Sequence, residues 1–398
     1  MRILLLFPHM VTAGGALTYT VRLAEQLQGQ GATVAVLVSR IERESLALPS
    51  GLEVISFDGP LTSSMGYWLL FPLWQKRINR AIAAWRPDVL VPQVFPSNWW
   101  GWLYRRQHSG VRLVWVCHEP SAFIHSLSWI RALRPWWKSA LARILRPFLK
   151  TVDLFLSREC DRVIANSRYT AAELERVYGK KAACIAYPGI DFSAYSGEIG
   201  PKEWSLITVA RLTGFKRIDF LLKVFARLLK SHPDLTYHIV GTGEEEAAMR
   251  RQAQLLGLQA QVIFHGTVDD RTLAGLYRRS CIYLSGSIDE PFGMAPLEAI
   301  AWGTPVVAHM SGGPLEFVTP DCGRLIDSQD VEEWAGEIAD YLAVLSTLKD
   351  SPDRVRECAR RFDWRISLCP AVEVIAGLSE ETGVTSEQPS ARRTVPER

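Results

Sequence analysis

The feature that most constrains this fold is a strand–turn–helix–strand pattern that occurs once in each half of the chain. In the first half, the apolar run at residues 3–7 leads through a Gly-Gly turn and a helical pattern to the β-branched run Thr33–Val38. In the second half, residues 206–210 lead through an amphipathic helical pattern to Thr236–Val240. Each pattern predicts a βαβ unit, and such units build parallel sheets with helices on both faces.

The length of the chain favours two such domains. Its 398 residues exceed one ordinary core. We expect an α/β protein with two Rossmann-like, doubly wound domains, residues 1–195 and 196–362. Residues 379–398 lack apolar periodicity and are rich in Ser, Thr, Glu and Arg, so they are expected to form a disordered tail.

The cysteine pattern and the hydropathy of the chain indicate the cellular compartment in which the protein is expected. The seven cysteines are scattered and form no C-x-x-C pair, which favours a reducing compartment and argues against a disulfide framework or structural zinc. No run of about 18 apolar residues suggests a membrane-spanning helix. The sequence therefore predicts a cytoplasmic protein.

Charge is distributed unevenly between the two halves. Residues 1–195 carry 23 Lys and Arg against 13 Asp and Glu, a net charge of +10, whereas residues 196–398 carry 22 against 29, a net charge of −7. Within residues 76–150 there are 13 basic residues and two acidic ones, and most of the 14 tryptophans lie between Trp68 and Trp137. This pattern favours an anionic partner for the first half.

The first candidate motif is Glu290-Pro-Phe-Gly-Met-Ala-Pro-Leu-Glu298, which follows a predicted strand and enters a predicted helix. The first backbone N–H groups of such a helix are free to bind an anion or a sugar hydroxyl. The two carboxylates could bind two separate diols. The alternative is a capped helix with two surface acids.

Three further motifs follow strands, where open α/β sheets bind ligands. Arg211 and Lys216 flank a glycine turn and suit a diphosphate, although a solvated loop would look the same. The Gly14-Gly15 pair suits close approach of the backbone to a ligand, or simply a tight turn. His118, at the end of residues 113–117, could donate to a substrate oxygen, although a structural histidine is the alternative.

Together these motifs resemble the retaining nucleotide-sugar glycosyltransferases of family 4, which have the GT-B fold with two domains facing a central cleft. The resemblance extends from residue 1 to about 376 and is most specific at 286–316, which includes Ser311-Gly-Gly-Pro-Leu-Glu316. In that fold, residues 363–378 would return to the first, acceptor-side domain. The His118-Glu-Pro stretch resembles a subgroup that contains many mannosyltransferases.

The resemblance implies specific roles in binding the donor nucleotide. Arg211 and Lys216 would bind the diphosphate, and Glu298 the ribose hydroxyls. Val268 lies in the segment whose backbone would contact the base, and Gly15 would let the backbone approach phosphate or acceptor. Thr213-Gly-Phe stands where a Pro/Glu-rich turn is common in the family, so the shape of this loop is left open.

The resemblance also implies roles in binding the donor sugar. Glu290 and the amides of Phe292, Gly293 and Met294 would hold the sugar, and His118 would lie near its reacting face. Of these residues, His118, Glu290 and the pair Arg211 and Lys216 are the candidates for catalysis.

The predicted chemistry is loss of a nucleoside diphosphate from the sugar, which two fixed cations and a helix N-terminus would stabilise. Retention without an obvious nucleophile suits front-face attack, with the departing phosphate taking the acceptor proton. The chain has no D-x-D, so neither a metal nor another cofactor is expected. It also has no P-loop, and Gly241-Thr-Gly243 fails the dinucleotide pattern because Glu246 holds the third position.

Residues 130–150 hold six basic residues and no acid, with apolar residues at helical spacing that is expected to be interrupted at Pro135 and Pro147. This resembles an interfacial helix on an anionic membrane surface. A packing face between domains is the alternative, and no recognition module supports a nucleic-acid partner.

The sequence thus predicts an enzyme that moves a sugar, for example mannose from GDP-mannose, onto a glycan or lipid-linked acceptor. We expect it in the cytoplasm, on the inner face of a membrane. A nucleotide-sugar 2-epimerase and a non-catalytic nucleotide-sugar sensor are the alternatives.

Overall fold

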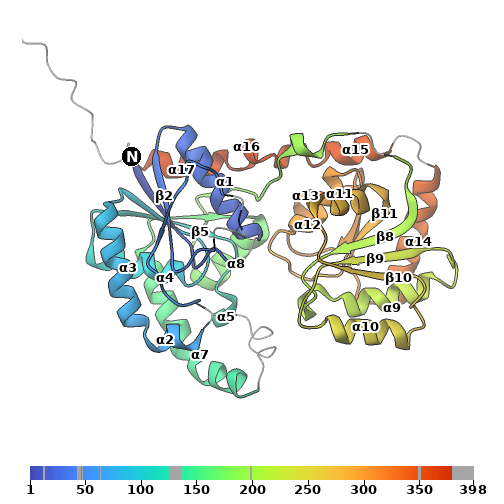
Figure 1. Cartoon of the computed structure of the whole chain (residues 1–398), viewed down its shortest axis with the longest axis horizontal. Helices are drawn as coiled ribbons and strands as arrows, with labels where there is room; N and C mark the ends of the chain where they lie inside the picture. Colours follow the sequence, from blue (N-terminus) through green and yellow to red (C-terminus); the bar gives the residue numbers. More distant parts are fainter. Residues whose placement is uncertain are drawn as a thin grey trace, which may run out of the picture.

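The structure is a computed structural model that describes residues 1–11, 14–42, 46, 48–62, 64–125, 136–197, 200–347 and 351–378. Figure 1 shows two α/β halves, with C-terminal helices running along one edge of the molecule from the second half back to the first. The predicted tail at 379–398 and the first part of the basic segment, residues 130–135, lie outside the described residues.

The N-terminal half contains a parallel sheet of seven strands. Its spatial order is β3 (Glu53–Ser56), β2 (Thr33–Val38), β1 (Arg2–Leu6), β4 (Val89–Pro92), β5 (Arg112–Cys117), β6 (Arg162–Ala165) and β7 (Cys184–Ile185). Alternate residues of a strand point to opposite faces. In β1, Ile3 and Leu5 pack into one core, whereas Leu4 and Leu6 pack into the core on the other face. Helices therefore cover both faces of this sheet.

These helices follow the strands in alternation, as a doubly wound fold requires. They are α1 (Gly15–Gly29), α2 (Met65–Leu69), α3 (Phe71–Trp85), α4 (Ser97–Gln107), α5 (Ala122–His125), α7 (Trp136–Leu156) and α8 (Arg168–Tyr178). The expected interruption at Pro147 is wrong, because α7 continues through that residue. The missing N–H of a proline removes one hydrogen bond, and packing of the apolar face of α7 on the core offsets that loss.

The C-terminal half contains a parallel sheet of six strands. Its spatial order is β10 (Val262–Gly266), β9 (Thr236–Val240), β8 (Glu203–Val209), β11 (Ser280–Ser285), β12 (Val306–His309) and β13 (Gly323–Ile326). Two separate apolar cores lie on its two faces. The helices of this half are α9 (Ile218–Leu228), α10 (Glu246–Leu255), α11 (Asp270–Arg279), α12 (Met294–Ala301), α13 (Pro314–Phe317), α14 (Val331–Thr347) and α15 (Ser351–Glu357).

The last two helices, α16 (Trp364–Ser367) and α17 (Cys369–Gly377), pack on the N-terminal half. Trp364 and Leu368 are buried in the same core as Leu23 and Leu27 of α1. The chain therefore crosses between the halves twice, once between β7 and β8 and once between α15 and α16 (Figure 1). In the part of the chain that the structure describes, no helix combines the length and the apolar character needed to cross a membrane.

Candidate active site

The loops that follow the strands of one half meet the loops that follow the strands of the other. Ser167, after β6, donates a hydrogen bond from Oγ to the carbonyl oxygen of Pro291, after β11, at 2.6 Å. A Cβ atom on Gly15, at the start of α1, would lie 3.4 Å from Cγ of Met294, at the start of α12. The carboxyl ends of the two parallel sheets therefore face each other, which is where open α/β folds bind ligands.

A buried carboxylate strengthens this seam between the halves. Glu316 of α13 accepts a hydrogen bond from the backbone N–H of Arg168 at 2.6 Å and from the hydroxyl of Tyr187 at 3.0 Å. The N-terminus of α8 favours a negative charge at that point. The sequence places Glu316 in a family motif but does not predict that it ties the halves together.

The structure brings Lys216 and Glu290 together, although separate roles were predicted for them. Lys216 Nζ lies 2.5 Å from Glu290 Oε1, and both side chains are largely buried. Lys216 follows β8 and Glu290 follows β11, and these two strands are neighbours in the sheet. The cation expected to bind phosphate and the carboxylate expected to bind sugar hydroxyls are therefore in direct contact with each other.

Arg211 is in the same loop as Lys216, but its side chain is exposed and no ion pair involves it among the described residues. The shape of the loop at Thr213-Gly-Phe, which the sequence left open, is defined in the structure. A short 3₁₀ turn forms over Gly214–Lys216, and the backbone N–H of Leu212 donates to the carbonyl of Thr242 at 2.9 Å. A Cβ on Gly243 would lie 2.3 Å from the carbonyl oxygen of Leu212, so the second glycine of the Gly-Thr-Gly segment is required for packing.

The loop that carries Glu290 is held by two glycines of the Ser-Gly-Gly motif. Gly312 has a φ of +67°, and a Cβ on Gly313 would lie 2.0 Å from the carbonyl oxygen of Phe292. The backbone N–H of Gly313 donates to the carbonyl of Glu290 at 2.7 Å. Only glycine permits this close approach of the two loops.

The start of α12 leaves donors free. Gly293 precedes the helix with a φ of +97°, and Phe292 is buried against other aromatic rings. Within the described ranges, no acceptor is recorded for the backbone N–H groups of Phe292, Gly293 and Met294. Unpaired amides at a helix N-terminus can bind an anion or a hydroxyl oxygen.

Glu298 lies one turn further along α12 and is surrounded by protein. Burial raises its pKa to about 7, while the hydroxyl of Tyr277, which donates to Glu298 Oε2 at 3.3 Å, acts in the opposite direction. Val268 packs against the same apolar cluster as Tyr277. The structure therefore places the two residues expected to bind the ribose and the base on one side of the C-terminal sheet.

His118 follows β5 in the N-terminal half and is a neutral ring. Burial lowers its pKa to about 4. Its Nε2 lies 3.0 Å from Gln93 Oε1, and its ring meets Tyr19 edge-to-face with 4.9 Å between centroids. A neutral, oriented imidazole can exchange hydrogen bonds with a sugar hydroxyl without adding charge.

Glu119 is a candidate site residue for which no role was predicted. Its side chain is exposed to solvent on one side. Desolvation by the surrounding protein raises the pKa of the Glu119 carboxyl, and the positive charge of Lys216 acts in the opposite direction. Its carboxyl is therefore within electrostatic reach of the Lys216–Glu290 pair in the other half. The sequence feature that could have indicated Glu119 is its position directly after His118.

Comparisons with known proteins agree with this geometry. A family model described as Glycosyltransferase Family 4 matches residues 13–194, and one described as Glycosyl transferases group 1 matches residues 191–361. The D-inositol 3-phosphate glycosyltransferase of Thermomonospora curvata is 26% identical over 429 residues, covering 95% of this chain and 94% of its own. A second D-inositol 3-phosphate glycosyltransferase, from Catenulispora acidiphila, is 28% identical over 320 residues, with 69% and 75% covered.

Solved structures show the same two-domain fold. Sucrose-phosphate synthase from Thermosynechococcus elongatus superposes with a TM-score of 0.74 at 21% identity, covering 96% of this chain and 98% of that one. The Anabaena protein HepE in complex with UDP-glucose gives 0.71 at 20% identity, with 95% and 100% covered. The expectation of two Rossmann-like domains in the GT-B arrangement is confirmed.

Proposed function

The chain is a glycosyltransferase with the GT-B fold, and from this premise we propose that it transfers a sugar from a nucleotide-sugar donor to a glycan or lipid-linked acceptor with retention of configuration. The observation that carries the proposal is the contact between Lys216 and Glu290 beside the free amides that begin α12. The donor diphosphate would take Lys216 as its counter-ion. This exchange would release Glu290 to accept hydrogen bonds from the sugar hydroxyls.

The proposed transfer needs no protein nucleophile. The bond between the anomeric carbon and the β-phosphate oxygen breaks, and the acceptor oxygen forms the new bond on the same face. The departing phosphate takes the proton of the acceptor hydroxyl. Arg211, Lys216 and the amides of Phe292, Gly293 and Met294 would stabilise the negative charge that develops on the phosphate or orient the sugar.

The donor base and sugar are proposed from weaker observations. We take GDP-mannose as the first donor to test because of the His118-Glu-Pro stretch, and UDP-glucose as the second because the Anabaena neighbour binds it. We place the acceptor on the N-terminal half and the donor on Glu298 and Val268. An inositol phosphate is the soluble alternative acceptor, because the curated relatives are named for D-inositol 3-phosphate.

A metal ion is not part of the proposal. In the described ranges, no three His, Cys, Asp or Glu side chains are grouped so that they could hold one. We likewise propose that the protein works in the cytoplasm, at the inner face of a membrane.

A thermal-shift screen of GDP-, UDP-, ADP- and dTDP-sugars would test donor binding, since a ligand of the folded state raises the melting temperature. Product analysis then separates the alternatives. Release of the nucleoside diphosphate with transfer of the sugar supports the proposal. A product with an inverted carbon 2 would indicate an epimerase, and binding without turnover would indicate a sensor.

A further inference from the structure

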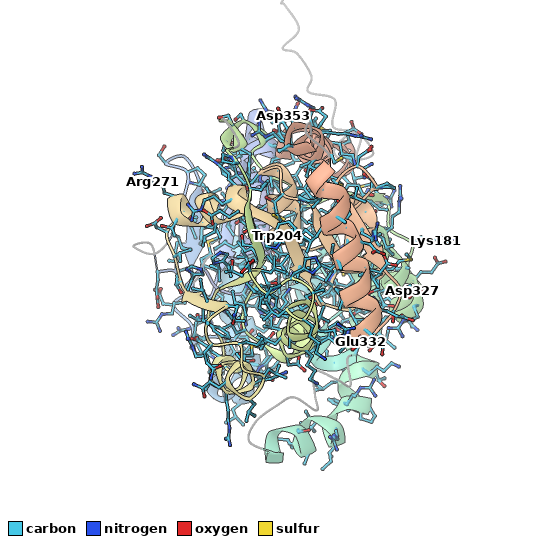
Figure 2. The ribbon with its side chains drawn as sticks, turned by 90° about the vertical axis from the view of Figure 1, so that its right-hand side faces the viewer. Lys181, Trp204, Arg271, Asp327, Glu332 and Asp353 are labelled. Carbon is cyan, nitrogen blue, oxygen red and sulfur yellow. The ribbon has the colours of Figure 1, made fainter. Side chains whose placement is uncertain are left out.

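Helix α7 presents apolar side chains to solvent along one face. These side chains recur at helical spacing and form what we call the α7 strip: Leu141, Ile144, Leu145 and Phe148, which are 45%, 75%, 43% and 67% exposed. Leu149 and Val152 continue the same face of α7, four residues after Leu145 and Phe148, and pack into the core. The α7 strip is therefore the part of this face that precedes the packed part. The helix extends beyond the edge of the N-terminal half in Figure 1 and below the rest of the chain in Figure 2.

A second exposed apolar group lies where α2 meets α3. It consists of Leu69, Leu70 and Leu73, which are 75%, 47% and 56% exposed. One tryptophan of α4 links this junction to α7. Trp99 meets the ring of Trp68 edge-to-face at 6.2 Å, and its Nε1 donates to Asp153 Oδ1 of α7 at 2.6 Å. Both apolar groups therefore belong to helices anchored on the same core residue.

The charges around these groups have one sign. Arg143 and Lys150 on α7 are exposed, as are three basic residues of α3, Lys76, Arg77 and Arg80. Among the described parts of α2, α3 and α7, Asp153 is the single acidic residue. It is fully buried and accepts hydrogen bonds from Trp99, His125 and Tyr178, so it offers no negative charge to the surface.

We infer that the α7 strip and the α2–α3 junction dock on an anionic lipid bilayer, so that the acceptor of the proposed reaction, on which this inference rests, is lipid-linked. Exposed aliphatic and aromatic side chains between cations are what an anionic membrane interface binds, with the apolar face among the acyl chains and the cations at the headgroups. A nucleic acid would match the charge but would gain nothing from the exposed aliphatic side chains of Leu141, Ile144 and Leu145. The remaining alternative, a second copy of the chain, would have to bring like charges together.

The test is co-sedimentation with vesicles of phosphatidylglycerol and phosphatidylcholine in equal parts. The variant Ile144→Ser/Phe148→Ser removes the two most exposed members of the α7 strip. Its matched control, Leu255→Ser/Leu256→Ser, removes two exposed leucines (80% and 38%) from the end of α10 in the other half. We expect at least a tenfold weaker partition for the strip variant and no change for the control.

A second pair of variants separates electrostatic attraction to the lipid headgroups from insertion of apolar side chains. Lys76→Gln/Arg143→Gln should weaken binding at low salt and make its salt dependence shallower. Lys223→Gln/Arg251→Gln, on the exposed surface of the C-terminal half, should bind like wild type. Wild type that ignores anionic vesicles, or a strip variant that sediments like wild type, would overturn the inference. So would a wild-type dimer in analytical ultracentrifugation that becomes monomeric on changing the strip.

Donor binding distinguishes failure of this inference from failure of the proposed function. The thermal shift with GDP-mannose and UDP-glucose is measured for all four variants. Absent vesicle binding with a normal donor shift overturns the docking surface alone. Vesicle binding without any donor shift leaves the docking surface intact and contradicts the proposed function.

Discussion

Replacing Lys216 with alanine tests the electrostatic core of the proposed site. The change removes a cation 2.5 Å from Glu290, at the point where charge would develop on the departing phosphate. Loss of one pre-placed donor of this kind costs about 10²–10³ in turnover, or about 3–4 kcal/mol of activation free energy. The same change leaves Glu290 unpaired and partly buried. The free energy of unfolding should fall by about 1–2 kcal/mol, between the values for exposed and fully buried pairs.

The assay is release of nucleoside diphosphate from the donor at saturating concentration, with melting temperature measured in parallel. Arg227→Ala is the matched control, because it removes a cation from the exposed pair with Glu332 in the same half. That control should retain full turnover and lose at most about 1 kcal/mol of stability. Near-wild-type turnover of Lys216→Ala, with the fold intact, would refute the reasoning.

Three further predictions concern the donor site. Arg211→Ala should also lower turnover by about 10²–10³ but leave the melting temperature unchanged, since Arg211 is exposed; equal loss of stability would contradict this. Activity should survive EDTA, and a loss that Mg²⁺ or Mn²⁺ restores would show that a metal neutralises the diphosphate. Glu298, with a pKa raised to about 7, should bind ribose hydroxyls as a carboxylate. The donor KM should therefore rise about tenfold per pH unit below pH 7, and Glu298→Gln should abolish this dependence.

The raised pKa of Glu298 also makes the free energy of unfolding depend on pH. Because the protein raises the pKa of Glu298 above its ordinary value, the folded state holds this proton more tightly than the unfolded state. Its contribution to the free energy of unfolding therefore declines as the pH rises from about 4.5 to about 7.

The central strands were predictable because they are buried on both faces and read as continuous apolar runs. Strands β3, β7 and β13 were not predicted. Each is short and only partly buried, and the apolar signal that distinguishes a strand from a loop is weak at such positions. The interruption expected at Pro147 does not occur: proline usually ends a helix, whereas packing of α7 sustains the helix here.

The candidate site was predictable as a set of motifs but not as contacts. Glycine turns and charged residues after strands identified Arg211, Lys216 and Glu290. The ion pair between the last two depends on the order of β8 and β11 in the sheet, which local sequence does not encode. Glu316, which joins the halves, was equally hidden, because its partners are more than 120 residues away along the chain.

The most direct measurement of the central claim is the anomeric configuration of the sugar released when water replaces the acceptor. Each donor that raises the melting temperature is incubated with the protein, and the first-formed sugar is followed by NMR before it mutarotates. We predict nucleoside diphosphate together with a sugar that keeps the anomeric configuration of the donor, and about 10²–10³-fold slower release of both from Lys216→Ala. An inverted sugar, or a bound donor that no acceptor consumes, would contradict the account.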